Sequence, residues 1–110
     1  MDQTLSELTF NTSGEGFNNI TSCINSWIAS KKIIKGILII STKHTSCSLI
    51  INENADPNVL KDLSRYMKSL VPEKSFIALD GESNPKEYLH SEEGLDDMPA
   101  HIKTMLTSNN

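Results

Sequence analysis

Three histidines, His44, His90 and His101, are the residues of this sequence whose side chains are best suited to chemistry. An imidazole can bind a metal ion, accept a proton or donate one near neutral pH. Each histidine lies in a polar segment, but the separations between them match no compact zinc motif. The spacing alone therefore leaves two interpretations open: three ordinary hydrogen-bonded histidines, or one polar site that the fold assembles.

A carboxylate precedes the last histidine by one helical turn. His101 is expected in the first turn of a helix, where the positive end of the dipole favours a neutral imidazole. Asp97 lies four residues earlier. If the helix extends that far, the carboxylate can orient the His101 ring or add a metal ligand. The alternative is that Asp97 only caps the helix.

A second group of polar residues, Asn52, Glu53, Asn54 and Asp56, follows an apolar run and precedes an expected helix. Carboxylates and free helix amides at such a junction suit a hard cation or a phosphate group. Asn and Asp are also ordinary turn and capping residues, so Glu53 is the one member without that routine explanation.

The three residues after His44 are Thr45, Ser46 and Cys47, which raises the possibility of a nucleophile. In an extended segment Ser46 shares the side of His44, whereas Cys47 points to the opposite side. A catalytic pair of Cys47 and His44 is therefore disfavoured, and so is a zinc site of the His-x-x-Cys type. Cys47 is instead predicted to be a small core residue.

The elements that must position these residues belong to one small domain. The chain has 110 residues, of which 37% are hydrophobic and 22% charged, as in soluble proteins with a packed core. A net charge of −4 with scattered basic residues gives no electrostatic site for nucleic acid or an anionic membrane. The polar N-terminus and the two cysteines predict a cytoplasmic protein with reduced thiols.

Helical periodicity and capping residues predict three helices. Asn19 is an expected N-cap before a first amphipathic helix, and Asp56 followed by Pro57 begins a second. A third is expected to begin between Asp97 and Pro99. Four strands are predicted from alternating or β-branched residues, with a loop over residues 80–93: Gln3–Asn11, Gly36–Ser41, Cys47–Asn52 and Ser75–Leu79. The second and third of these are expected to form a hairpin with His44 near its turn.

Several segments resemble the YjbQ family, also called the secondary thiamine-phosphate synthase family. They are HTSCSLIINENADP at His44–Pro57, YLH at Tyr88–His90 and PAHIKTML at Pro99–Leu106, with ITSCINSWIASKKIIKG before them. The resemblance covers nearly the whole chain. Family members usually continue past the last helix into further strands, so residues 1–110 are interpreted as a single YjbQ-like domain that is shortened at its C-terminus.

The resemblance implies an α+β fold, in which helices pack on one face of an antiparallel sheet, and a homotrimer. It also implies a metal-assisted transferase that joins a pyrimidine diphosphate to a thiazole phosphate, so the expected partner is a small phosphorylated metabolite. The expected cofactor is a divalent metal ion, zinc or magnesium, held by His44, His90 and His101. The resemblance also implies Glu53 and Asn54 as site residues. Taken together, the site is expected to use His44, Glu53 and His101 for catalysis, and Thr45, Ser46, Asn54 and Asp97 for substrate binding.

Two alternatives to an enzyme remain open. The first is a housekeeping protein that binds a metal or a phosphorylated metabolite without turnover. The second is a purely structural role for the three histidines.

Overall fold

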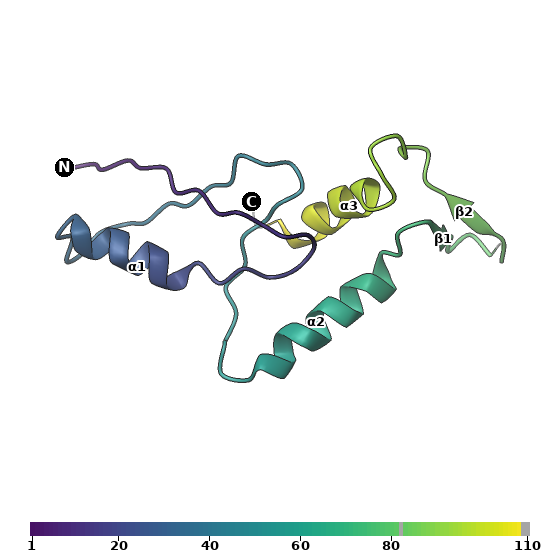
Figure 1. Ribbon diagram of the computed structural model, residues 1–110, viewed down its shortest axis with the longest axis horizontal. Helices are drawn as coiled ribbons and strands as arrows, with labels where there is room; N and C mark the ends of the chain where they lie inside the picture. Colours follow the sequence, from purple (N-terminus) through teal and green to yellow (C-terminus); the bar gives the residue numbers. More distant parts are fainter. Residues whose placement is uncertain (82, 109–110) are drawn as a thin grey trace. The chain divides into compact units, whose positions relative to one another are not determined.

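The regular structure consists of helices and one pair of strands. The computed structural model describes residues 1–81 and 83–108. In chain order the elements of this part are α1 (Thr21–Ser30), α2 (Pro57–Leu70), β1 (Ser75–Ile77), β2 (Pro85–Glu87) and α3 (Asp97–Thr107) (Figure 1). The predicted α+β class with antiparallel strand pairing is confirmed.

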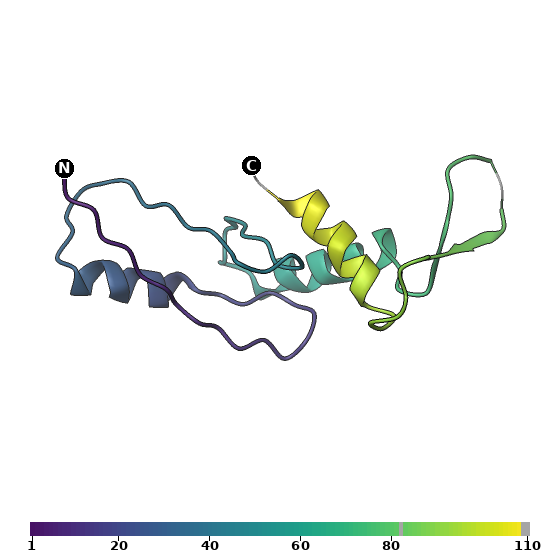
Figure 2. The same cartoon turned by 90° about the horizontal axis from the view of Figure 1, so that it is seen from above.

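The chain divides into two compact units, Met1–Ile39 and Ile40–Asn110. The first unit contains α1, and the second contains the other four elements, which Figure 2 shows from a second direction. All three histidines lie in the second unit, so the description of the site concerns this unit alone.

Local signals explain where the helices begin. The Asn19 side chain accepts a hydrogen bond from the Thr21 amide (3.1 Å) before α1. The Asp56 carboxylate caps α2 by accepting from the Asn58 amide (2.8 Å), and Pro57 occupies the first turn, where its missing N–H costs nothing. Because the Asp56–Asn58 bond joins residues two apart, the sequence alone was enough to predict the start of α2. The expected N-cap of α1 is wrong by one residue, because Ile20 occupies that position and makes no side-chain capping bond.

Three predicted strands are wrong. The described segments Gln3–Asn11, Gly36–Ser41 and Cys47–Asn52 contain no strand. The Thr42 hydroxyl donates to the Cys47 carbonyl (3.4 Å) between the ends of the expected hairpin, but no backbone pairing follows from it. β-branched residues favour extended backbone, but a strand also requires a partner for its backbone groups. Cys47 is exposed and is not a core residue.

The observed strand pair is short and antiparallel. Ser75 pairs with Glu87, Phe76 with Lys86 and Ile77 with Pro85. β1 confirms the predicted strand after α2, although it ends at Ile77. β2 lies within the segment that was predicted to be a loop. The strand was not predicted because its sequence, Pro-Lys-Glu, is polar and begins with a residue that strands usually avoid.

Few side chains of the described residues are buried. Val71 directly follows α2 and is 4% exposed, and Pro99 in the first turn of α3 is fully buried. Both cysteines are free. None of the helices in residues 1–81 and 83–108 is long and apolar enough to cross a membrane.

Candidate metal centre

Two histidines and a carboxylate converge where the segment after β2 meets α3. His90 Nε2 lies 2.6 Å from Asp97 Oδ2, and His101 Nε2 lies 3.5 Å from the same oxygen. One ligating atom from each of the three residues lies within 4.8 Å of those from the other two. Asp97 is therefore the centre of the cluster, which we call the His90–Asp97–His101 cluster.

Helix α3 positions two of the three residues. Asp97 is its first residue and His101 lies four positions later, so both side chains project from the same face one turn apart. The helix begins at Asp97, so the carboxylate lies beside the His101 ring. This was one of the two alternatives that the sequence left open for Asp97. Asp97 also lies in the first helical turn, where a negative charge is favourable.

A tight loop returns the third residue to the helix. The Gly94 amide donates to the Ser91 carbonyl (3.4 Å), and Gly94 has a φ of +123°, a conformation that L side chains rarely adopt. A Cβ atom on Gly94 would lie 3.0 Å from Asp96 Oδ1. The loop between His90 and Asp97 therefore requires glycine. This role of Gly94 was not predicted from the sequence, although a glycine in a polar loop between two site residues is a usable signal.

The cluster is accessible from solvent. The Asp97 side chain is 23% exposed, compared with 38% for His101 and 49% for His90. The two imidazole rings lie edge to face, with centroids 5.7 Å apart and an interplanar angle of 60°. An ion or a small ligand can therefore reach all three side chains without a rearrangement of the core.

The donor atoms suit a divalent transition metal. Two imidazole nitrogens and one carboxylate oxygen match the three protein ligands of many catalytic zinc sites. With bonds of about 2.0–2.1 Å, tetrahedral geometry places ligand atoms roughly 3.3 Å apart. The separation of His101 and Asp97 is close to this value. His90 and Asp97 are at hydrogen-bond distance, so a bound ion would take the place of the shared proton.

His44 lies outside this cluster in the single chain. Its Nδ1 accepts a hydrogen bond from the Ser46 amide (3.1 Å) and lies 2.9 Å from the Ser46 hydroxyl oxygen. The two side chains thus lie on the same side, at a turn formed by Thr45 and Ser46. The participation of His44, Thr45 and Ser46 in one site with the other histidines stays a prediction.

The second polar group of the sequence is also separate from the cluster. Glu53 and Asn54 are exposed, and the Glu53 carbonyl accepts from the Asn52 side chain (3.0 Å). Asp56 caps α2, which is the routine role considered for it. The roles of Glu53 and Asn54 in catalysis or substrate binding therefore also stay predictions.

Comparison with known proteins identifies the family. The model of the UPF0047 protein YjbQ-like family matches residues 6–110. The chain belongs to this family. The resemblance drawn from the His44–Pro57 segment is thereby confirmed. No solved structure matches the chain.

Three relatives illustrate the similarity. The UPF0047 protein sll1880 of Synechocystis is 45% identical over 96 residues, which are 87% of this chain and 58% of that protein. The UPF0047 proteins YjbQ of Escherichia coli O157:H7 and Salmonella typhimurium are both 35% identical. Their alignments cover 90% and 88% of this chain and 64% and 63% of the relatives, respectively. The chain thus spans less than two thirds of these relatives, whose names specify a family and no reaction.

Proposed function

We propose that this chain binds a divalent metal ion through the His90–Asp97–His101 cluster and uses it for group transfer on small phosphorylated metabolites. The observation that carries the proposal is the convergence of three ligating atoms within 4.8 Å. The reaction is the one that the family resemblance implies, the joining of a pyrimidine diphosphate to a thiazole phosphate. Zinc is favoured over magnesium because two of the three donors are imidazole nitrogens.

Each residue of the cluster has a definite task in this proposal. His90 and His101 supply neutral nitrogen ligands, and Asp97 supplies an anionic oxygen between them. Three protein ligands leave one position open for a phosphate oxygen or water. A metal ion bound there would neutralise charge that develops on the leaving phosphate. The exposure of the cluster allows a phosphorylated molecule to approach from solvent.

A matched pair of substitutions tests metal binding. Asp97→Asn should weaken zinc binding at least tenfold or so, because it removes the anionic ligand between the histidines. Asp96→Asn makes the same chemical change one residue earlier, outside the cluster, and should leave the zinc affinity unchanged. Isothermal titration calorimetry of the full-length variants with zinc measures both affinities. Equal affinities in wild type and Asp97→Asn would refute the metal site.

A second candidate function is metal or phosphometabolite binding without turnover. It is favoured by the position of Glu53, an expected catalytic residue, outside the cluster. Incubation of the zinc-loaded chain with both phosphorylated substrates separates the two functions. Repeated turnover that is lost in Asp97→Asn supports the transferase, whereas binding without product supports the second candidate.

A further inference from the structure

One side of the His44 ring faces hydrogen-bond donors. The Ser46 backbone amide donates to His44 Nδ1 (3.1 Å), and the Ser46 hydroxyl oxygen lies 2.9 Å from the same nitrogen. A backbone amide can only donate, so Nδ1 is the unprotonated nitrogen of the neutral imidazole. The ring proton is therefore on Nε2, because the bond that one ring nitrogen makes fixes the state of the other.

This arrangement disfavours a metal ion at His44. A histidine that binds a metal through Nε2 carries its proton on Nδ1 and donates it to a carboxylate, a carbonyl group or water. At His44 that proton would point at the Ser46 amide, which is itself a donor. A metal bound through Nδ1 would instead displace the amide from its acceptor. Metal binding at either nitrogen thus costs the bond to Ser46, whereas donation from Nε2–H keeps it.

The surroundings of the other two histidines differ from those of His44. His90 and His101 both direct Nε2 at the Asp97 carboxylate, at distances of 2.6 Å and 3.5 Å. The group that these two rings face is an anion, which can itself bind a metal ion. The three histidines therefore divide into two metal ligands beside a carboxylate and one hydrogen-bond donor.

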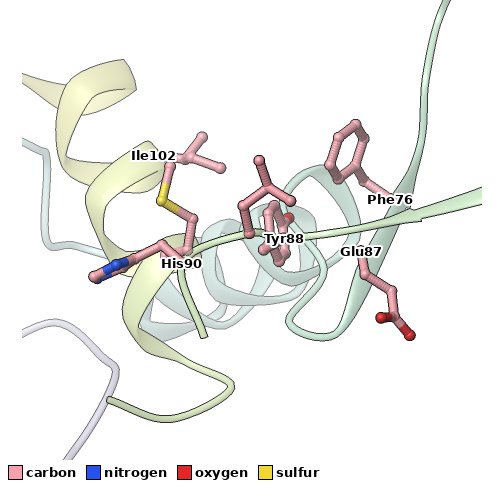
Figure 3. A pocket seen from close by; sticks show the side chains of 7 residues that line it. Phe76, Glu87, Tyr88, His90 and Ile102 are labelled. Atoms are coloured by element: carbon pink, nitrogen blue, oxygen red, sulfur yellow. The ribbon is translucent and has the colours of Figure 1, made fainter. Parts of the chain in front are cut away.

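A phosphate group at the metal needs hydrogen-bond donors as well. Its oxygens that do not touch the metal are strong, charged acceptors. An apolar pocket borders the cluster at His90, and Figure 3 shows the side chains that line it. Apart from His90, the one O–H or N–H group among these described side chains is the Tyr88 hydroxyl, which already donates to the Pro72 carbonyl (2.7 Å). A donor for the phosphate must therefore come from another segment.

The segment after His44 contacts the helix of the cluster. The Ser48 hydroxyl oxygen lies 2.5 Å from Thr107 Oγ1 at the end of α3. Thr107 donates to the Lys103 carbonyl (2.7 Å), so Ser48 is the donor to Thr107. From Thr107 back to His101 the helix spans about 9 Å. The four residues from His44 to Ser48 span at most about 13 Å, so the chain length allows His44 to reach a ligand at the cluster.

We infer that His44 binds a phosphate oxygen of the substrate through its Nε2–H group and does not ligate the metal ion. This inference rests on the proposed function, from which it takes the phosphorylated metabolite. A hydrogen bond to an anionic oxygen is about twice as strong as one between neutral groups. His44 is exposed, so a ligand can approach its ring from solvent.

Nuclear magnetic resonance of the full chain with isotope-labelled histidine tests the state of each ring. Long-range proton–nitrogen spectra distinguish protonated, unprotonated and metal-bound ring nitrogens. The His44 signals are identified by their loss in His44→Ala. Zinc should convert one ring nitrogen each of His90 and His101 to the metal-bound state and leave His44 with its proton on Nε2. A metal-bound nitrogen in His44 would overturn the inference.

Two substitutions of His44 separate a donor from a ligand. Glutamine has a side-chain N–H group near the position of Nε2 but is not a usual zinc ligand, whereas alanine has neither function. Both variants should fold, because the bonds of His44 lie within its own turn. In isothermal titration calorimetry of the zinc-loaded chain with inorganic diphosphate, His44→Ala should bind about tenfold more weakly than the wild type. His44→Gln should retain the affinity within about threefold, and zinc should bind both variants as tightly as the wild type.

The outcomes separate this inference from the proposed function. A zinc affinity that falls in both His44→Gln and His44→Ala would make His44 a ligand, which overturns the inference and leaves a metal site in place. Equal diphosphate affinities in the wild type and His44→Ala also overturn it. A wild-type chain that binds no zinc refutes the proposed function, and the inference with it.

Discussion

At the scale of single residues, Asp97 joins the cluster because one carboxylate oxygen faces both imidazoles. The sequence offered its relation to His101 as one of two alternatives, since one helical turn fixes which side chains share a face. It could not predict the contact with His90, because that contact depends on how the intervening loop turns. The described hydrogen bonds of His44 stay within His44–Ser46, so they do not place it relative to the other two histidines.

Without metal, the hydrogen bond between His90 and Asp97 ties the segment after β2 to α3. His90→Ala removes this bond and should lower the free energy of unfolding by about 0.5–1.5 kcal/mol, the usual net value of such a bond. Urea denaturation of the zinc-free protein measures the change. His44→Ala should have a smaller effect, because the bonds of His44 lie within three consecutive residues. An unchanged stability in His90→Ala would show that the bond contributes nothing in solution.

At the scale of elements, the helices were predictable and most strands were not. Asp56 and Pro57 define the start of α2 within three residues, so no distant part of the chain is needed. Strand pairing is a relation between segments, and the isoleucines of Gly36–Ser41 contain no information about their partner. β2 was missed for the opposite reason: it pairs with β1 although its own residues do not favour a strand.

The loop before α3 depends on the conformation of Gly94. Gly94→Ala places a Cβ at a φ of +123° and close to Asp96, which should cost about 1–3 kcal/mol and weaken zinc binding by displacing His90. Thermal unfolding and zinc titration measure the two effects. Gly36→Ala is the control, because its added Cβ would meet only Ile33 at an ordinary 3.8 Å. Equal stability and zinc affinity in the two variants would contradict this role.

Tyr88 connects the end of β2 to the segment after α2 through its bond to Pro72. Burial raises the pKa of Tyr88 above its ordinary value of 10.0. The folded state therefore keeps this proton at a pH where the unfolded chain has lost it. The contribution of Tyr88 to stability is complete below about pH 10 and is lost as the pH rises above it.

Chemical denaturation between pH 8 and pH 11 tests this contribution. Tyr88→Phe should lower stability by about 1 kcal/mol at pH 8 and reduce the decline of stability at higher pH. Tyr66, which is 65% exposed, supplies the matched control: Tyr66→Phe should keep the wild-type pH profile. If Tyr88→Phe kept the pH profile of the wild type, burial of this phenol would not contribute to the pH dependence of the stability.

At the scale of the whole molecule, large apolar side chains of the described residues remain in contact with solvent. Those that are nearly fully exposed include Ile34, Ile51, Leu79 and Leu89. Exposed apolar surface of this kind marks association sites, and a small domain gains stability when it associates.

The family resemblance leads us to predict a homotrimer. Size-exclusion chromatography with light scattering should give a mass three times the 12.2 kDa of one chain, and the melting temperature should rise with protein concentration. A mass of one chain at micromolar concentration, with a melting temperature independent of concentration, would exclude the trimer.

The proposed function requires that the His90–Asp97–His101 cluster holds a divalent metal ion. An anomalous difference map at the zinc edge, from crystals of the zinc-loaded protein, tests it most directly. It should show a peak within about 2.0–2.2 Å of His90 Nε2, His101 Nε2 and an Asp97 carboxylate oxygen. A map without a peak there, or with zinc held by other residues alone, would contradict the claim.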